Sequence, residues 1–310
     1  MPNFGKYVIV IITKIFGVMM MSAILITVII LLYSFQTLFC KLFTDRYPGK
    51  SELSSPVFCV IEGVFITLFT FAFNGFRFAC APLTLLLGVL NAAMLFGYNT
   101  SLIAAGKKGS FAFMNVCMLF GGIIVPSVYG VIWLSESMSA LKLIGVAVML
   151  VACVLMNLDE IKLKNTPAIY YVFCLLLFIF NGMYGTFVKM QSVINPDQKQ
   201  EMIMITFLIM GVIAFIELYS KEKKDTARAF TLNKKCIAPL VICLLSAALA
   251  INLLMFILPL IDTAVLYTIE NGGVLILSAI YSVVLFKEKL RTPKLIGILL
   301  AVISITVLSI

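Results

Sequence analysis

The sequence predicts an all-α membrane protein with ten transmembrane helices, arranged as two inverted five-helix repeats. Composition is the first observation behind this prediction. Of 310 residues, 62% are hydrophobic and 12% are charged, and the mean hydropathy is +1.13. A water-soluble domain needs more polar side chains than this to cover its surface. Apolar runs long enough to cross a hydrocarbon core recur from one end of the chain to the other.

An internal repeat is the second observation. The letters KLIG occur at 142–145 and again at 294–297, an offset of 152 residues. Held without a gap, this offset gives ten identities between 109–158 and 261–310, where composition alone gives about four. The chain therefore contains an internal repeat, in which a unit of about 150 residues occurs twice. Five helices per unit is an odd number, so the second unit enters the membrane upside down relative to the first.

The first unit covers residues 18–158. Its predicted helices are the apolar runs at 18–40, 55–75, 82–105, 109–134 and 139–158. The Ser-Pro pair at 55–56 predicts a hydroxyl cap before proline at the start of the second helix. Residues 1–17 form an interfacial lead-in, because Lys6 and Lys14 interrupt their apolar run.

The second unit covers residues 159–310. Its predicted helices are the apolar runs at 166–190, 201–220, 236–259, 262–286 and 292–310. Thr-Pro pairs at 166–167 and 292–293 predict two more hydroxyl caps. The longest polar stretch, 220–236, is a loop, which leaves no room for a separate soluble domain.

Basic residues gather in the loops that follow the odd-numbered helices. The positive-inside rule therefore places these loops in the cytoplasm and both termini outside. The net charge of +9 serves to orient the chain in the lipid bilayer and does not indicate a nucleic-acid-binding surface. We expect a multi-pass integral protein of a bacterial plasma membrane that binds no nucleic acid.

Several kinds of chemistry are excluded by what the sequence lacks. It has no histidine, which removes histidine-based catalysis and metal ligation. Its eight cysteines include no CxxC pair, and no phosphate-binding glycine-rich loop occurs. We predict no catalytic residue, no metal and no cofactor. An intramembrane enzyme would need a nucleophile and a base in reach of each other, and no such constellation is visible.

The chain resembles the drug/metabolite transporter superfamily, EamA type. The resemblance is carried by WLSESMSALKLIGVAVMLVACVL at 133–155 and VLFKEKLRTPKLIGILLAVISITVL at 284–308. It implies that the first, third and fourth helices of each unit surround a central cavity, and that the second helix, with Glu62, lies towards the periphery. The segment 266–290 also resembles the third helix of the small multidrug resistance family. That family's glutamate in its first helix is replaced here by Tyr33 and Asn181, so proton-for-cation exchange by that group does not carry over.

One carboxyl group is the first candidate for the binding site. Glu270 lies about two turns into the ninth helix, and an ionisable group so deep in a span is costly and often functional. It could bind a cation, a proton, or an amino or hydroxyl group, or it could pair structurally. Glu62 poses the same alternatives. Glu136 and Glu288 occupy equivalent helix ends and are expected to fix loops or form gate contacts.

Amide and tyrosine side chains give a second, neutral set of candidates. With Glu270 they complete the predicted substrate-binding residues, which are Tyr33, Gln36, Asn91, Tyr98, Asn115, Asn181, Tyr184, Asn252, Tyr267 and Asn271. Tyr267 and Asn271 are one turn apart and share a helix face. Each asparagine alone could equally hold two helices together. Together the set predicts a partly aromatic pocket with few charges.

These observations predict a secondary transporter that exports a small metabolite by alternating access. A pocket of this kind suits an amino-acid-like or compact organic substrate, including organic cations, and fits polyanions poorly. The alternative is a non-transporting membrane sensor or assembly protein built on the same ten-helix bundle. A channel would show a charged ring or a filter-like loop. A duplicated chain needs no partner, so we expect a monomer, with a dimer as the alternative.

Overall fold

The structure is a computed structural model, which describes residues 4–106, 108–158, 161, 166–222, 226–287 and 291–309. Over these residues every regular element is helical. The α-helices are α1 Phe4–Arg46, α2 Ser54–Phe73, α3 Pro82–Gly106, α4 Phe111–Trp133, α5 Ala140–Asn157, α6 Ala168–Ile194, α7 Lys199–Lys221, α8 Thr226–Ala229, α9 Lys234–Ile257, α10 Thr263–Phe286 and α11 Thr292–Leu308. Short 3-10 turns, η1 Ser51–Leu53 and η3 Pro196–Gln198, precede α2 and α7.

The ten predicted helices all occur, and the described residues add the one-turn helix α8. Nine of the helices are long and apolar enough to cross a membrane, and α11 is a shorter apolar helix. The all-helical membrane class is therefore confirmed. Helix boundaries agree with the predicted ones within a few residues, except at α1.

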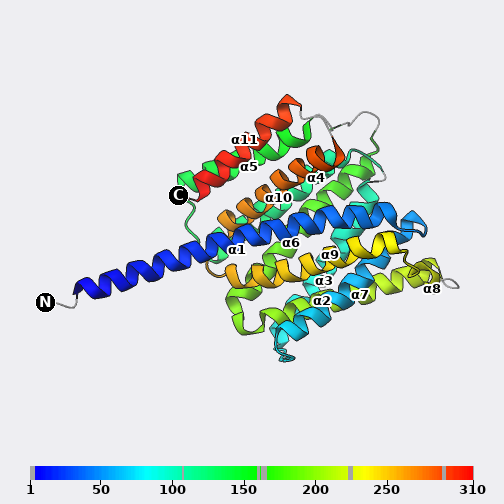
Figure 1. Ribbon diagram of the computed structural model, residues 1–310, viewed down its shortest axis with the longest axis horizontal. Coiled ribbons are helices and arrows are strands. Elements are labelled where there is room, and N and C mark those ends of the chain that lie inside the picture. The colour runs from blue at the N-terminus through cyan, green and yellow to red at the C-terminus, as the bar shows by residue number, and fades with distance from the viewer. Residues whose placement is uncertain are drawn as a thin grey trace.

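Helix α1 runs without a break for 43 residues, which at about 1.5 Å per residue exceeds the thickness of a hydrocarbon core. Its membrane-length part is Met21–Arg46. Figure 1 shows the preceding part projecting beyond the bundle, with both chain ends on that same side. The boundary predicted at residue 18 is thus no helix start, while the interfacial position of residues 1–17 stays a prediction.

The three predicted hydroxyl caps are wrong. None of the N-cap residues of α2, α6 and α11, which are Leu53, Pro167 and Arg291, caps its helix with a side-chain hydrogen bond. Helix α2 begins two residues and α11 one residue too early for this capping, so Ser55 and Thr292 lie inside them. Proline holds the residue before it in extended backbone, which fits the position of Thr166 outside α6.

Side-chain caps are found on other helices. Ser110, Ser139 and Asn233 have extended backbone, and each accepts a hydrogen bond from the amide three residues on. These caps start α4, α5 and α9. Because Ser110 and Ser139 precede helices of the first half and Asn233 one of the second, both halves use this device.

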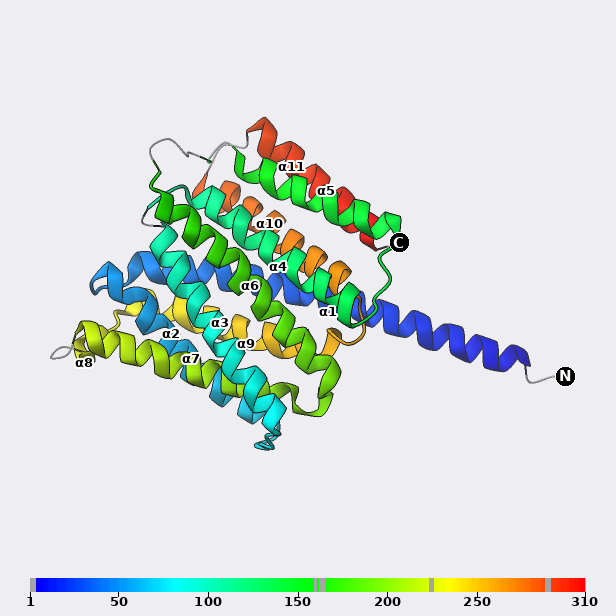
Figure 2. The ribbon, with the colours of Figure 1, turned by 180° about the vertical axis from the view of Figure 1, so that it is seen from behind.

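Helices of the two halves interleave instead of forming two separate bundles. Helix α1 packs along α9, and α6 packs along α3 and α4. Helix α2 pairs with α7, α5 with α11, and α4 with α10. Figures 1 and 2 show the α5–α11 pair at one edge of the molecule and the α2–α7 pair at the other, with α1, α6 and α9 between them.

Small residues let these pairs approach closely. A Cβ atom on Gly63 of α2 would lie 2.7 Å from the carbonyl oxygen of Phe207 and 2.8 Å from Cα of Gly211, both on α7. In the repeated KLIG segment, a Cβ on Gly297 would lie 3.0 Å from the carbonyl oxygen of Ala152. Gly297 of KLIG therefore serves helix packing there, since close helix contact in membranes depends on small side chains.

Candidate functional site

The centre of the bundle brings together three tyrosines and a carboxyl group. Tyr33 of α1 interacts electrostatically with Glu270, Tyr184 and Tyr267. The Tyr267 hydroxyl donates to the carbonyl oxygen of Gly185 at 2.7 Å, which ties α10 to α6. One carboxyl oxygen of Glu270, Oε2, is buried and has no hydrogen-bond partner. Four predicted site residues from three helices therefore share one region.

Two asparagines lie beside this group. The amide of Asn181 donates to the carbonyl oxygen of Met118 at 2.9 Å, and that of Asn271 donates to the carbonyl oxygen of Tyr267 at 2.8 Å. A Cβ atom on Gly122 would lie 2.7 Å from Nδ2 of Asn181 and 3.5 Å from Oδ1 of Asn271. The absence of a side chain at Gly122 thus leaves room for both amides between α4, α6 and α10.

Glu62 faces the interior, although its helix lies at the edge of the bundle. Residues 62, 66 and 70 share a helix face, and on it Ile66 and Thr70 are fully buried. Thr70 accepts a hydrogen bond from Asn252 of α9 at 2.9 Å. Glu62 itself is 6% exposed and interacts electrostatically with Tyr98 and Tyr184. The peripheral place that the family resemblance implied holds for α2 but not for this side chain.

The helices beside Tyr184 pack without a cavity. The contact region between α3, α6, α7 and α9 has no room for a water molecule. It is lined by Asn91, Tyr184, Val188, Met202, Ile203, Thr206, Phe207, Ile251 and Met255. Asn91 is 2% exposed, and its Nδ2 donates to Thr206 at 3.5 Å while its Oδ1 has no partner. This region therefore carries one unused hydrogen-bond acceptor among mostly apolar side chains.

The other predicted site residues make different contacts. Asn115 donates to Asn157 of α5 at 3.4 Å, away from the tyrosines. Asn252 is fully buried and joins α9 to Thr70. The hydroxyl of Tyr98 lies 2.9 Å from the sulfur of Met118. Gln36 is half-buried on α1. Whether these four contact substrate stays a prediction.

A buried ion pair, which the sequence reasoning did not pair, joins the two halves at one end. Nζ of Lys189 on α6 lies 3.1 Å from Oε1 of Glu136, and the side chains are 3% and 13% exposed. Lys189 also donates to the carbonyl oxygens of Leu258 and Ile261 at 2.7 and 3.0 Å. Glu136 accepts from the amide and the hydroxyl of Thr263, both at 2.7 Å. We call this group the interhalf clamp.

The clamp provides hydrogen-bond partners for backbone N–H and C=O groups at two helix ends. Glu136 caps the start of α10, where free N–H groups favour a negative charge. Lys189 binds carbonyl oxygens beyond the end of α9, where a positive charge is favoured. The expected loop-fixing role of Glu136 is confirmed, while Glu288 lies outside the described residues. The available signal for Lys189 was its match to Lys41 in the repeat, together with its place inside an apolar run.

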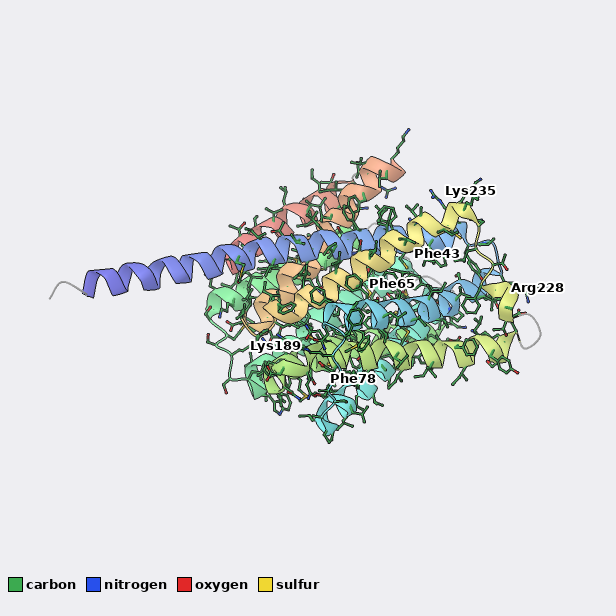
Figure 3. All side chains as sticks on the ribbon, turned by 60° about the horizontal axis from the view of Figure 1, so that its bottom comes forward. Phe43, Phe65, Phe78, Lys189, Arg228 and Lys235 are labelled. Atoms are coloured by element: carbon green, nitrogen blue, oxygen red, sulfur yellow. The ribbon has the colours of Figure 1, made fainter. Side chains whose placement is uncertain are left out.

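Further polar contacts strengthen the end of the bundle that holds the clamp. Gln191 of α6 and Asn195 both donate to the hydroxyl of Thr84 on α3, at 3.2 and 3.0 Å. Lys142 pairs with Asp262. Figure 3 shows Lys189 well away from Arg228 and Lys235, which mark the opposite, basic end. Thr84, Lys189 and Gln191 are buried, so the two halves are closed against each other here.

The basic end has a contact of its own between the halves. The Tyr47 hydroxyl donates to the carbonyl oxygen of Ala229 at 2.6 Å. Burial, and to a smaller extent the neighbouring Cys236, raises the pKa of Tyr47 above its ordinary value of 10.0. Lys50 also pairs with Glu222 of the other half at this end, with side chains that are 71% and 17% exposed.

Metal binding finds no support among the residues described. No group of three histidine, cysteine, aspartate or glutamate side chains there could hold an ion. All eight cysteines are free. What the arrangement offers instead is a polar, acidic centre enclosed by helices of both halves.

The fold and this centre define a polytopic helical membrane protein with a polar site between two interleaved halves. Residues 168–310 match the model of the EamA-like transporter family, so this half of the chain belongs to that family, in the drug/metabolite transporter superfamily. The EamA-type resemblance is thereby confirmed. A comparison with curated protein sequences finds no match.

Solved structures share the fold. One, described only as a crystal structure of a protein, superposes with a TM-score of 0.73 and is 13% identical. The superposition covers 92% of this chain and 95% of the other. Because this covers both halves, the fold of the whole chain is one that a crystal structure already contains.

Proposed function

We propose that the chain is a secondary transporter that moves a small organic molecule by alternating access, in the direction of export from a bacterial cell. The observation that carries the proposal is the exchanged packing of the two halves around the polar centre. Helix α1 packs on α9 as α6 packs on α3, and α1 contacts α10 as α6 contacts α4. Such a swap is what two inverted five-helix repeats related by a two-fold axis would produce.

The contacts at the two ends of the bundle support alternating access. At the clamp end the halves are joined by the buried pair of Lys189 and Glu136, whereas at the basic end they are joined by the more exposed pair of Lys50 and Glu222. Two inverted units have nearly equal energies in two arrangements that a two-fold axis in the membrane plane relates. Breaking the clamp would therefore open this end as the other closes. The substrate would bind at the centre, near Tyr184 and Glu270. A monomer suffices for this cycle.

The test uses purified full-length protein in liposomes. A thermal-shift screen first covers amino acids, nucleosides, sugars, polyols and amines, since a ligand at about a hundred times its Kd stabilises by about 2.7 kcal/mol. Each compound that binds is then tested for counterflow, in which unlabelled substrate inside drives transient uptake of labelled substrate. Saturable counterflow is expected, and protein-free liposomes are the control. Binding without flux would overturn the proposal and favour a membrane sensor.

A further inference from the structure

An apolar cavity opens on the outer face of the α2–α7 pair. It has a volume of about 230 Å³, and its lining residues are Thr67, Leu68 and Phe71 of α2, Phe78 of the loop that joins α2 to α3, and Met204, Ile205 and Leu208 of α7. The hydroxyl of Thr67 already donates to the carbonyl oxygen of Gly63 at 2.6 Å. Since an apolar cavity of roughly 150 Å³ stays dry and accepts a hydrocarbon, this α2–α7 cavity has room for one.

The α2–α7 cavity lies at membrane depth and opens outward. Its two helices belong to the membrane-length segments Ser54–Phe73 and Pro196–Lys221. Leu68 and Leu208 are 62% and 50% exposed, so the opening faces the surroundings of the bundle. Thr67 lies six residues before the last residue of α2, which is about 9 Å at 1.5 Å per residue. The cavity therefore begins near the level of the lipid headgroups and extends into the hydrocarbon.

The loop that carries Phe78 is fixed to the second half of the chain by hydrogen bonds. At its start, Nδ2 of Asn74 donates to Oε1 of Glu201 at 3.0 Å. At its end, the amide of Ala81 donates to Oε1 of Gln198 at 2.8 Å. Figure 3 shows Phe78 away from Arg228 and Lys235 of the basic end. Phe78 is thus held in place as a wall, and a preformed cavity saves a ligand the cost of ordering it.

A cation lies next to this wall. Arg77 directly precedes Phe78, and its carbonyl oxygen accepts a hydrogen bond from Asn74 at 2.9 Å. The Arg77 side chain is exposed and, within the described ranges, forms no ion pair. Phe76 and Phe78 on either side of it are 71% and 55% exposed. Aromatic and basic side chains together are typical of the headgroup level, and a guanidinium group matches a phosphate in charge and geometry.

We propose that the α2–α7 cavity binds one phospholipid, with an acyl chain in the cavity and the phosphate group on Arg77. The bilayer is the source of this ligand, because the cavity opens within the membrane-length part of two helices. Since α2 and α7 belong to different halves of the chain, the bound lipid joins the two halves at the end that holds the clamp. The inference concerns lipid binding and does not depend on the proposed transport function.

Native mass spectrometry of the purified full-length protein in a neutral detergent tests the headgroup. The two probes carry the same dioleoyl chains and are phosphatidylglycerol and diacylglycerol. Saturable binding of one phosphatidylglycerol is expected, about fivefold tighter than that of diacylglycerol, since a basic side chain near a lipid phosphate contributes about this factor. Arg77→Gln should remove the difference. Equal affinity of the two probes for the parent chain would overturn the inference.

A pair of tryptophan variants tests the cavity. Leu208→Trp fills it and is expected to weaken phosphatidylglycerol binding at least about tenfold. Val212→Trp is the matched control, because Val212 lies one turn further along α7, is 52% exposed and is not among the lining residues. Equal affinity of the two variants would refute the cavity as the site. If Leu208→Trp does not fold, Phe78→Ala at its exposed loop position decides: weaker binding is expected, and unchanged binding contradicts the inference.

The same spectra distinguish a lipid from a second copy of the chain. A monomer with one bound lipid is the expected species. A dimer that phosphatidylglycerol does not dissociate and that Leu208→Trp abolishes would make the cavity a protein contact and overturn the inference. Failure of every phospholipid to bind leaves the transport proposal in place, while lipid binding in a protein that shows no counterflow of any compound refutes transport alone.

Discussion

Removing the positive charge of the interhalf clamp tests the closed end most directly. Lys189→Met keeps an unbranched chain of similar length but leaves Glu136 buried without its cation. It also leaves the carbonyl oxygens of Leu258 and Ile261 without the donor that lies 2.7 and 3.0 Å away. Breaking a buried pair by removing one partner costs about 3–5 kcal/mol. Thr263 still donates two hydrogen bonds to Glu136, which places the expected cost near the lower limit.

This free energy should appear in the balance between the closed and open clamp end. A loss of about 3 kcal/mol shifts that balance by roughly two orders of magnitude. A cysteine at Leu266, which is 1% exposed and lies one turn into α10, reports the opening through labelling by a membrane-impermeant maleimide. Labelling is expected to be slow in the parent chain and at least about a hundredfold faster with Lys189→Met.

Lys142→Met is the matched control for this measurement. Lys142 pairs with Asp262 at the same end, but the side chains are 27% and 36% exposed, so the pair contributes at most about 1 kcal/mol. The control should change labelling only slightly. The reasoning is refuted if Lys142→Met and Lys189→Met accelerate labelling equally, or if Glu136→Gln and Lys189→Met show no coupling in a double-mutant cycle.

Three further predictions concern packing, pH and a buried amide. Gly121→Ala should destabilise the protein by about 1–3 kcal/mol in thermal unfolding, since its Cβ would lie 2.0 Å from the carbonyl oxygen of Phe178; Gly185→Ala, with a nearest contact of 3.2 Å, should cost less. Because the pKa of Tyr47 is raised on folding, its contribution to stability is complete below pH 10 and is lost as pH rises through the folded-state pKa. In Tyr47→Phe the melting temperature should therefore depend less on pH in that range, and the free energy of unfolding below it should fall by about 1 kcal/mol. Asn91→Leu should leave the melting temperature within a few degrees of the parent, because Oδ1 is already unpaired and the bond of Nδ2 to Thr206 is long, at 3.5 Å; a large fall in melting temperature would contradict this reasoning.

The sequence by itself determined the helical membrane class and the places of ten apolar helices, of which nine have membrane length. Both follow from local composition, because a span is recognised from about twenty apolar residues. The loop-fixing role of Glu136 was predicted correctly because a charge at a helix end has few alternative roles. The hydroxyl caps failed because an exact helix start depends on neighbouring loops as well as on the capping residue.

Only the tertiary structure decided which polar side chains meet. In a membrane, the outside of a helix bundle is as apolar as its inside, so hydrophobic periodicity does not identify the face that points inward. The sequence therefore gave no means of seeing that Glu62 reaches Tyr184 from an edge helix, or that Asn115 turns to Asn157. Lys189 and Glu136 are 53 positions apart and meet because the second half is threaded between helices of the first.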